Sequence, residues 1–70
     1  MAYQVKSAKE ATTIATNFLK QYYSFTRPKR ASKDNDIWVV EVDVGVIITE
    51  IAQVRIDAST ADVIGYSFPK

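Results

Sequence analysis

Apolar residues near the N-terminus recur at the spacing of one face of an α-helix. They occupy positions 8, 11, 14, 15, 18, 19 and 22, which are mostly three or four residues apart. Ser7 directly precedes this stripe, and Glu10 lies three residues after Ser7, which is the pattern of a capping box. The threonines at 12, 13 and 16 are weak helix formers, so the helix needs a packed apolar face. We predict one amphipathic helix at about 7–23.

Residues 24–36 show no apolar periodicity and are interpreted as a loop. Pro28 cannot continue a helix, and it disfavours helical backbone at Arg27. The segment is basic at first and acidic at its end. Its length is at the long end for a connection inside a compact domain.

Three later segments, 36–44, 52–57 and 63–68, alternate between two faces as half-buried β-strands do. Glu41 and Asp43 lie on one face of the first segment, so we expect that face to contact solvent. The residues predicted to point inward are Trp38, Val40, Val42, Val44, Ala52, Val54, Ile56, Ile64, Tyr66 and Phe68.

A helix followed by three strands predicts an α+β domain of two layers. In it, one N-terminal helix packs on a three-stranded antiparallel sheet, in the order α-β-β-β. The 70 residues form a single domain, 1–70, and a chain of this size buries only about 60% of the surface that it exposes when unfolded. The sequence contains no cysteine for a disulfide, so either a well-patterned core or a partner subunit has to supply stability.

The segment 57–62, DASTAD, reverses the chain without glycine or proline. Asp57, Ser59, Thr60 and Asp62 have short side chains that bond nearby backbone N–H groups and mimic a turn. The alternative is a cation site, but a hard cation needs about six or more oxygen ligands and this segment offers two carboxylates. We therefore predict a structural turn.

No catalytic constellation is apparent in the sequence. The chain has no cysteine or histidine for a nucleophile–base pair, and its two glycines, Gly45 and Gly65, are too few for a phosphate-binding loop. Glu41 and Asp43 could in principle act as an acid–base pair, although a solvated strand face is the simpler interpretation. We expect no enzyme activity, no cofactor, no metal and no small-molecule substrate.

Charge is distributed very unevenly along the chain, although the net charge is only +1. Residues 1–33 carry a net charge of +6 and residues 34–70 a net charge of −5. The two halves can attract each other within the fold or steer a charged partner. A solvated surface without a partner is the favoured interpretation, because most surface charge contributes little.

A basic cluster next to aromatic residues is the candidate contact for an anionic partner. Basic groups neutralise phosphates and aromatic rings stack on bases, so nucleic acid is an alternative partner. The nearly neutral chain and the position of Tyr22 on the apolar helix stripe argue for a solvated loop instead. The candidate residues are Arg27, Lys29, Arg30 and Lys33.

The segment 44–51, VGVIITEI, holds more apolar residues than one alternating strand face can bury. Glu50 is its only charge, and it has no lysine or proline to protect a sheet edge. An exposed apolar patch usually marks an interface, so we predict self-association as a symmetric homodimer. Alternatively, the segment lines an extended hairpin under the helix. The candidate partner-binding residues are Val46, Ile47, Ile48 and Ile51.

WVVEV at 38–42, followed by VRIDASTADVIGY at 54–66, resembles the PepSY domain. The pattern of that family is a helix, then W-x-V-x-V, a hairpin, and V-x-hydrophobic-D-x-x-T-G-x-V. Ala61 stands where the family usually has glycine, and an alanine with left-handed backbone costs about 1–2 kcal/mol. The matching positions are Trp38, Val40, Val42, Val54, Ile56, Asp57, Thr60 and Val63.

The PepSY resemblance implies a small non-enzymatic module that binds or restrains another protein, for which peptidases are the suggested targets. The chain is also similar to the C-terminal part of the gas vesicle protein O family, which has W-x-V-E-V and a terminal GY. That second resemblance implies a gas vesicle accessory protein. No apolar stretch is long enough to span a bilayer and no secretory signal precedes the helix, so a cytoplasmic location without membrane contact is the default expectation.

Overall fold

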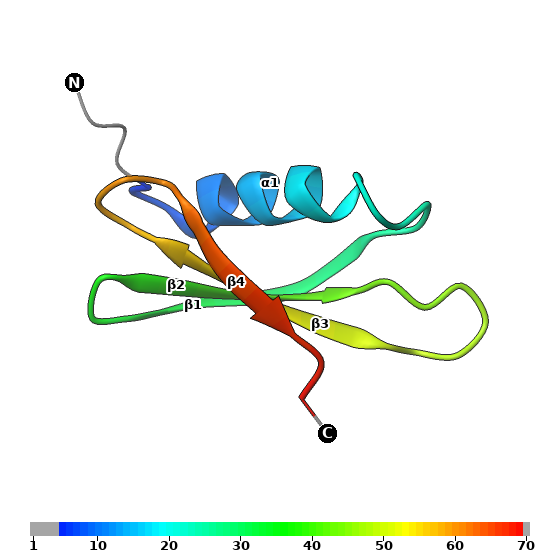
Figure 1. The fold of residues 1–70 in the computed structure, drawn as a ribbon. Coiled ribbons are helices and arrows are strands. Elements are labelled where there is room, and N and C mark those ends of the chain that lie inside the picture. Colours follow the sequence, from blue (N-terminus) through cyan, green and yellow to red (C-terminus); the bar gives the residue numbers. More distant parts are fainter. Residues whose placement is uncertain (1–4, 70) are drawn as a thin grey trace.

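The computed structural model describes residues 5–69 and shows one helix lying along one face of a four-stranded antiparallel sheet (Figure 1). The strands follow one another in the order β1-β2-β3-β4, and each pairs with the next. The α+β class with the helix first is confirmed, but the prediction of three strands is wrong. The elements are α1 (Ala8–Leu19), β1 (Arg27–Asp34), β2 (Ile37–Asp43), β3 (Ile51–Asp57) and β4 (Val63–Ser67).

Strand β1 lies within the segment that was predicted to be a loop. It pairs with β2 so that Ala31 is opposite Val40 and Lys33 is opposite Trp38. Ala31 is the only half-buried residue of this edge strand, so the sequence shows no apolar alternation. Asn35 turns the chain into β2 with a φ of 57°, which asparagine tolerates better than most residues. Backbone pairing with β2 therefore makes this strand, without an apolar face of its own.

The helix α1 is shorter than predicted and ends at Leu19, where the Tyr23 N–H donates to the Leu19 carbonyl at 2.9 Å. Its N-terminus is capped as expected, because the Glu10 N–H donates to Ser7 Oγ at 3.2 Å. The Glu10 carboxylate accepts from the backbone N–H of Lys6 at 2.9 Å, whereas a capping box uses the N–H of the N-cap residue, Ser7. The capping residues therefore determine where the helix starts. A turn after Leu19 ends the helix before the predicted end at residue 23.

The hydrophobic core lies between α1 and the adjacent face of the sheet. Strands β2 and β3 alternate as predicted, with every second residue buried on this side. On the helix, the fully buried residues are Ala11, Ala15 and Leu19, whereas Ile14 and Phe18 are only partly buried. Small alanines let α1 approach the sheet closely. The buried sheet residues are Trp38, Val40, Val42, Ala52, Val54 and Ile56.

Strand β4 departs from the predicted alternation. A register shift between Arg55 and Ile56 places Val63 opposite Ile56, and Val63 packs against the core. Ile64, which was predicted to point inward, is 54% exposed. A bulge in an edge strand changes which residues face the core, and the simple alternation is lost there. Tyr66 and Phe68 also remain partly exposed at the margin of the core.

The β3–β4 connection is the structural turn that DASTAD predicts. Asp57 Oδ1 accepts from the Ser59 N–H at 2.8 Å, and Thr60 Oγ1 accepts from the Asp62 N–H at 3.3 Å. The Ala61 N–H donates to the Asp57 carbonyl at 2.8 Å, and Ala61 has a φ of 67°. The short polar side chains therefore bond the backbone of their own turn, and the left-handed position falls on an alanine.

Candidate functional site

The loop 44–50 joins β2 to β3 and is anchored at its base by a buried carboxylate. Asp43 was expected to face solvent but is only 5% exposed. Its Oδ1 accepts from the N–H of Gly45 at 2.9 Å and from the N–H of Glu50 at 3.1 Å. The Val44 N–H donates to the Glu50 carbonyl at 2.9 Å. One acidic side chain thus ties the two ends of the loop together.

The environment of Asp43 favours its ionised form. The hydrogen bonds from the Gly45 and Glu50 N–H groups lower the pKa of this carboxyl, and they outweigh the opposing effect of burial. The positive charges of Arg27 and Lys29 lower this pKa further. The expectation of a solvated Asp43 is therefore wrong, because the side chain folds under the loop and bonds its backbone.

Gly45 is required by the tight path of this loop. A Cβ atom at residue 45 would overlap the carbonyl oxygen of Ile48 and would lie 2.9 Å from the backbone nitrogen of Glu50. Any side chain here forces the loop backbone to move. The loop therefore turns back closely on itself, which projects its middle residues away from the sheet.

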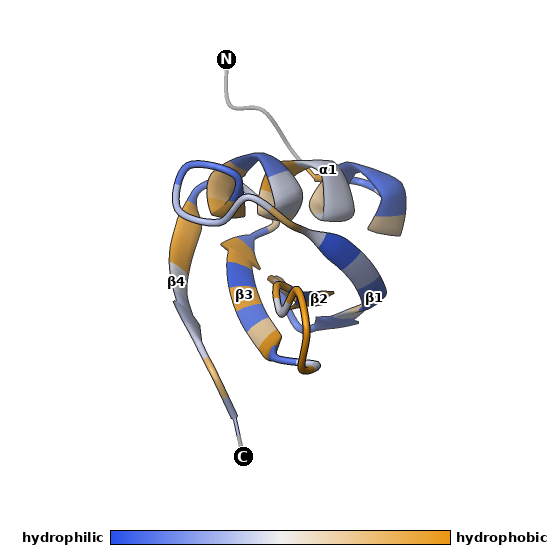
Figure 2. Ribbon diagram, turned by 90° about the vertical axis from the view of Figure 1, so that its right-hand side faces the viewer, coloured by the Kyte–Doolittle hydropathy of each residue, from blue (hydrophilic) through white to orange (hydrophobic). Residues whose placement is uncertain are grey.

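Three apolar side chains form the tip of this loop, and we call residues 46–48 the apolar tip. Val46 is 73% exposed, Ile47 94% and Ile48 79%. Figure 2 views the molecule from this end, with the hydrophobic loop in the foreground. The exposure contradicts the alternative of a hairpin buried under the helix. Ile51, the fourth candidate, begins β3 and is half-buried, so it does not belong to the tip.

A cluster of aromatic rings lies where the C-terminal end of α1 meets β4. The Phe18 and Tyr66 ring centroids are 5.4 Å apart, and Tyr22 stacks on Tyr66 at 6.5 Å. Tyr23 and Phe68 extend the cluster, and their centroids are 6.2 Å apart. Burial raises the pKa of Tyr23, and its hydrogen bond with Tyr66 raises it further. Sequence analysis missed this cluster because its members come from segments that only the fold brings together.

The basic candidates lie on β1, where Lys33 is on the opposite face from Arg27 and Arg30. Residues directly opposite each other in a sheet share a face, and Arg30 is opposite Glu41 while Lys33 is opposite Trp38. Arg30 therefore lies on the face away from α1, and its Nε is 3.9 Å from Glu41 Oε1. Lys33 lies on the helix side. Arg27 is opposite Asp43, so the basic and acidic halves of the chain meet between β1 and β2.

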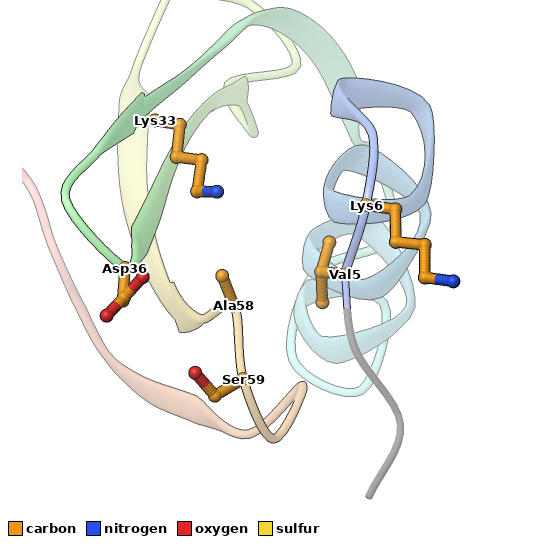
Figure 3. Close-up of a pocket in the computed structure, with 6 residues that line it drawn as sticks. All are labelled: Val5, Lys6, Lys33, Asp36, Ala58 and Ser59. Carbon is orange, nitrogen blue, oxygen red and sulfur yellow. The ribbon is translucent and has the colours of Figure 1, made fainter.

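A pocket of about 340 Å³ lies at the other end of the sheet, beside the two hairpin turns (Figure 3). Most of its lining side chains are solvent-exposed and of mixed charge. In the close-up, the Lys33 side chain points across the opening and the Lys6 side chain points away from it. A ligand here would contact mainly solvated groups, which makes the pocket a weaker candidate than the apolar tip. The lining residues are Val5, Lys6, Lys33, Asp36, Ala58 and Ser59.

Comparison of the chain with protein-family models, with curated protein sequences and with solved structures gave no match. Within residues 5–69, no three acidic, histidine or cysteine side chains lie close enough together to hold a metal ion. No helix in that part of the chain is long and apolar enough to cross a membrane.

Proposed function

We propose that the domain is a small non-enzymatic protein-interaction module that contacts its partner through the apolar tip. The observation that supports this is the exposure of Val46, Ile47 and Ile48 on a loop whose base is tied by Asp43. Consecutive β-branched side chains in water are unfavourable for an isolated monomer, and a contiguous exposed apolar patch usually marks an interface.

The energetics of the apolar tip suit a weak and reversible contact. Burying one large aliphatic side chain contributes about 1.5–3 kcal/mol, so three such side chains contribute about 5–9 kcal/mol. Association costs about 4–15 kcal/mol in lost freedom of motion. Because the two ends of the loop are already bonded together, little further ordering is required when it binds. The largest surplus is about 5 kcal/mol, so the tip alone supports association with a Kd in the sub-millimolar range or weaker.

A second copy of the chain is the simplest partner, because one patch then covers itself around a two-fold axis. The resemblance to the PepSY domain supports a protein partner more generally, such as a peptidase that the module binds or restrains. In both cases the same three side chains make the contact, so one set of variants tests both.

Sedimentation velocity of the protein from about 5 to 200 μM tests this proposal. We expect the average mass to rise with concentration above that of the 7.9 kDa monomer. Ile47→Lys and Ile48→Lys should abolish the rise, because a buried unpaired charge opposes association. Thr49→Lys, at an exposed position of the same loop, is the control and should associate like the unmodified chain.

If the protein stays monomeric, the next test looks for a different protein as the partner. In that case a pull-down from the native host, with nucleic acid removed, should capture a partner that Ile47→Lys releases and Thr49→Lys retains. If neither a dimer nor a partner depends on Ile47, the proposal is wrong.

Nucleic-acid binding through Arg27, Lys29, Arg30 and Lys33 is the alternative from another class, and a gas vesicle accessory role is a third. Lys33 lies on the opposite face of β1 from Arg27 and Arg30, and Arg30 is 3.9 Å from Glu41, which leaves fewer charges for one phosphate-binding track. A gel shift at low salt that weakens steeply as salt increases would favour nucleic acid over the proposed module.

A further inference from the structure

The two edges of the sheet differ in how they are protected from further pairing. β1, with the sequence RPKRASKD, carries a proline and five charged residues. These features are typical of edge strands that resist pairing with another chain. Both edge strands also have a register shift, which lies between Pro28 and Arg30 in β1 and at Ile64 in β4. β4, with the sequence VIGYS, contains no charge and no proline. Among residues 5–69, no strand pairs with the outer side of β4.

A positive charge lies over β4 on the face of the sheet away from α1. Arg55 is on β3 opposite Gly65, and its Nη2 atom is 3.4 Å from where a Cβ of residue 65 would be. Its Nη1 atom donates to Ser67 Oγ at 3.4 Å. The ion pair found in the described part of the chain is Arg30–Glu41, so Arg55 has no carboxylate partner there. Because Gly65 has no side chain, the guanidinium reaches across β4 toward its open edge.

The opposite face of β4 presents aromatic and apolar surface. Tyr66 lies on the helix side opposite Val54, and it stacks with Tyr22, which is 61% exposed. Phe68 continues this surface at a centroid distance of 5.9 Å from Tyr66. A strand placed beside β4 would therefore find rings on one face and a guanidinium on the other.

We propose that the edge of β4 accepts an extended segment of a partner protein that has apolar side chains on one face and carboxylates on the other. The backbone of that segment would pair with β4, its apolar side chains would contact Tyr22 and Tyr66, and a carboxylate would pair with Arg55. Main-chain pairing of this kind supplies affinity, and the alternating side chains supply specificity. This site is separate from the apolar tip and does not depend on the function proposed for it.

A second copy of the chain fits this edge less well than an acidic segment does. Antiparallel pairing of β4 with β4 would place the Arg55 groups of both copies on the same face, separated only by the two β4 strands. The two guanidinium groups would both extend over β4 toward the new contact, and like charges repel each other. An acidic strand instead provides the carboxylate that Arg55 lacks within residues 5–69.

The test uses a synthetic peptide, N-acetyl-Thr-Val-Glu-Val-Glu-Val-Thr-amide, titrated into isotope-labelled protein. We expect the amide signals of β4 and the side-chain Nε signal of Arg55 to shift in ¹H–¹⁵N spectra at millimolar peptide. A peptide with Lys in place of both Glu residues should bind less tightly, by up to about fivefold for each exposed ion pair lost. This comparison needs no protein variant, so it does not depend on any variant folding.

Two protein variants refine the assignment. Arg55→Gln should weaken binding of the Glu peptide and abolish the preference for Glu over Lys, and a dispersed spectrum will show that the variant is folded. Ile47→Lys should bind the Glu peptide like the unmodified chain, which separates this site from the apolar tip.

Three outcomes would overturn the proposal. The first is the absence of shifts in β4, or shifts in β1 instead. The second is equal binding of the Glu and Lys peptides. The third is a shift of the β4 signals when protein concentration alone increases, because the occupant of the edge is then a second copy.

Discussion

The conformational strain of the β3–β4 turn falls on Ala61, whose φ of 67° places a Cβ atom where left-handed backbone crowds it. The turn forms nevertheless, because Asp57 and Thr60 accept hydrogen bonds from its backbone and the Ala61 N–H bonds the Asp57 carbonyl. The methyl group of Ala61 also packs against the core. An unfavourable residue is thus held by several local bonds.

Replacing Ala61 with glycine should leave the free energy of unfolding unchanged or raise it by up to about 1 kcal/mol. Glycine removes the left-handed strain, and the greater freedom of the unfolded chain offsets part of the gain. Ala58→Gly is the matched control, because Ala58 is buried and its φ is not positive. This variant should have a free energy of unfolding about 1 kcal/mol lower than that of the unmodified chain. Urea denaturation of both variants measures the difference, and equal losses would contradict the assigned strain.

The Asp43 carboxylate makes the free energy of unfolding depend on pH in the acidic range. Its hydrogen bonds hold the pKa of the folded state below that of the unfolded state. The resulting stabilisation is present above the unfolded pKa of about 4 and is lost as pH falls through the lower folded pKa. Asp43→Asn retains an oxygen acceptor but does not titrate, so its urea midpoint should fall less between pH 5 and pH 2. An unchanged pH profile in this variant would contradict the role of Asp43.

At the scale of elements, the connection between β2 and β3 depends on close backbone approach. Val44 pairs with Glu50 at its base, and Gly45 leaves space for the Ile48 carbonyl. The segment thereby presents its apolar residues outward and does not continue as a strand. The shape of this connection, and not only its composition, creates the apolar tip.

Gly45→Ala should lower the free energy of unfolding by about 1–3 kcal/mol and shift the amide signals of residues 43–50. The reason is overpacking, because the added Cβ meets backbone atoms that cannot move independently. Gly65→Ala is the control, since a Cβ there meets only the flexible Arg55 guanidinium at 3.4 Å. Thermal unfolding of the two variants should separate them clearly, and equal tolerance of both would contradict the loop geometry.

At the scale of the whole molecule, the elongated fold has two chemically different ends. The overall extents are 40 × 22 × 18 Å. One end carries the β1–β2 and β3–β4 turns, beside the polar pocket lined by Asp36 and Ser59. The other end carries the apolar tip, in the β2–β3 loop. Both proposed interaction surfaces, the apolar tip and the edge of β4, contain apolar side chains that the single helix does not cover. One helix is too small to cover a four-stranded sheet completely.

The buried stripe of α1 is narrower than its apolar stripe, because only some of the apolar residues are fully buried. Leu19 is fully buried, whereas Phe18 is partly exposed and packs edge-to-face on Tyr22 and Tyr66. Leu19→Ala should cost about 2–5 kcal/mol, a large part of the stability of a domain this small. Phe18→Ala should cost about 2 kcal/mol, less than the 3–5 kcal/mol of a fully buried ring. Chemical denaturation of both variants compares the two losses of unfolding free energy. A larger loss in Phe18→Ala than in Leu19→Ala would contradict the assignment of Leu19 to the buried stripe.

The sequence alone determined the parts of the fold that repeat with a regular period. The helix with its Ser7 cap and the alternation in β2 and β3 follow from local patterns, because burial on one side selects apolar residues every two or every three to four positions. The DASTAD turn was also predictable, since its side chains bond the backbone of the same six residues. The exposed apolar tip was inferred from an excess of apolar residues that no single face could bury.

The tertiary structure decided what depends on residues distant in the chain. β1 exists because β2 offers backbone partners, so its own sequence of charged residues carries no strand signal. Asp43 is buried because the following loop folds over it, and Ile64 is exposed because a bulge shifts the register of β4. The position of Arg55 over Gly65 likewise required the pairing of β3 with β4. Periodicity reports which side of an element is buried, whereas pairing partners, bulges and loop closures are set only when the whole chain packs.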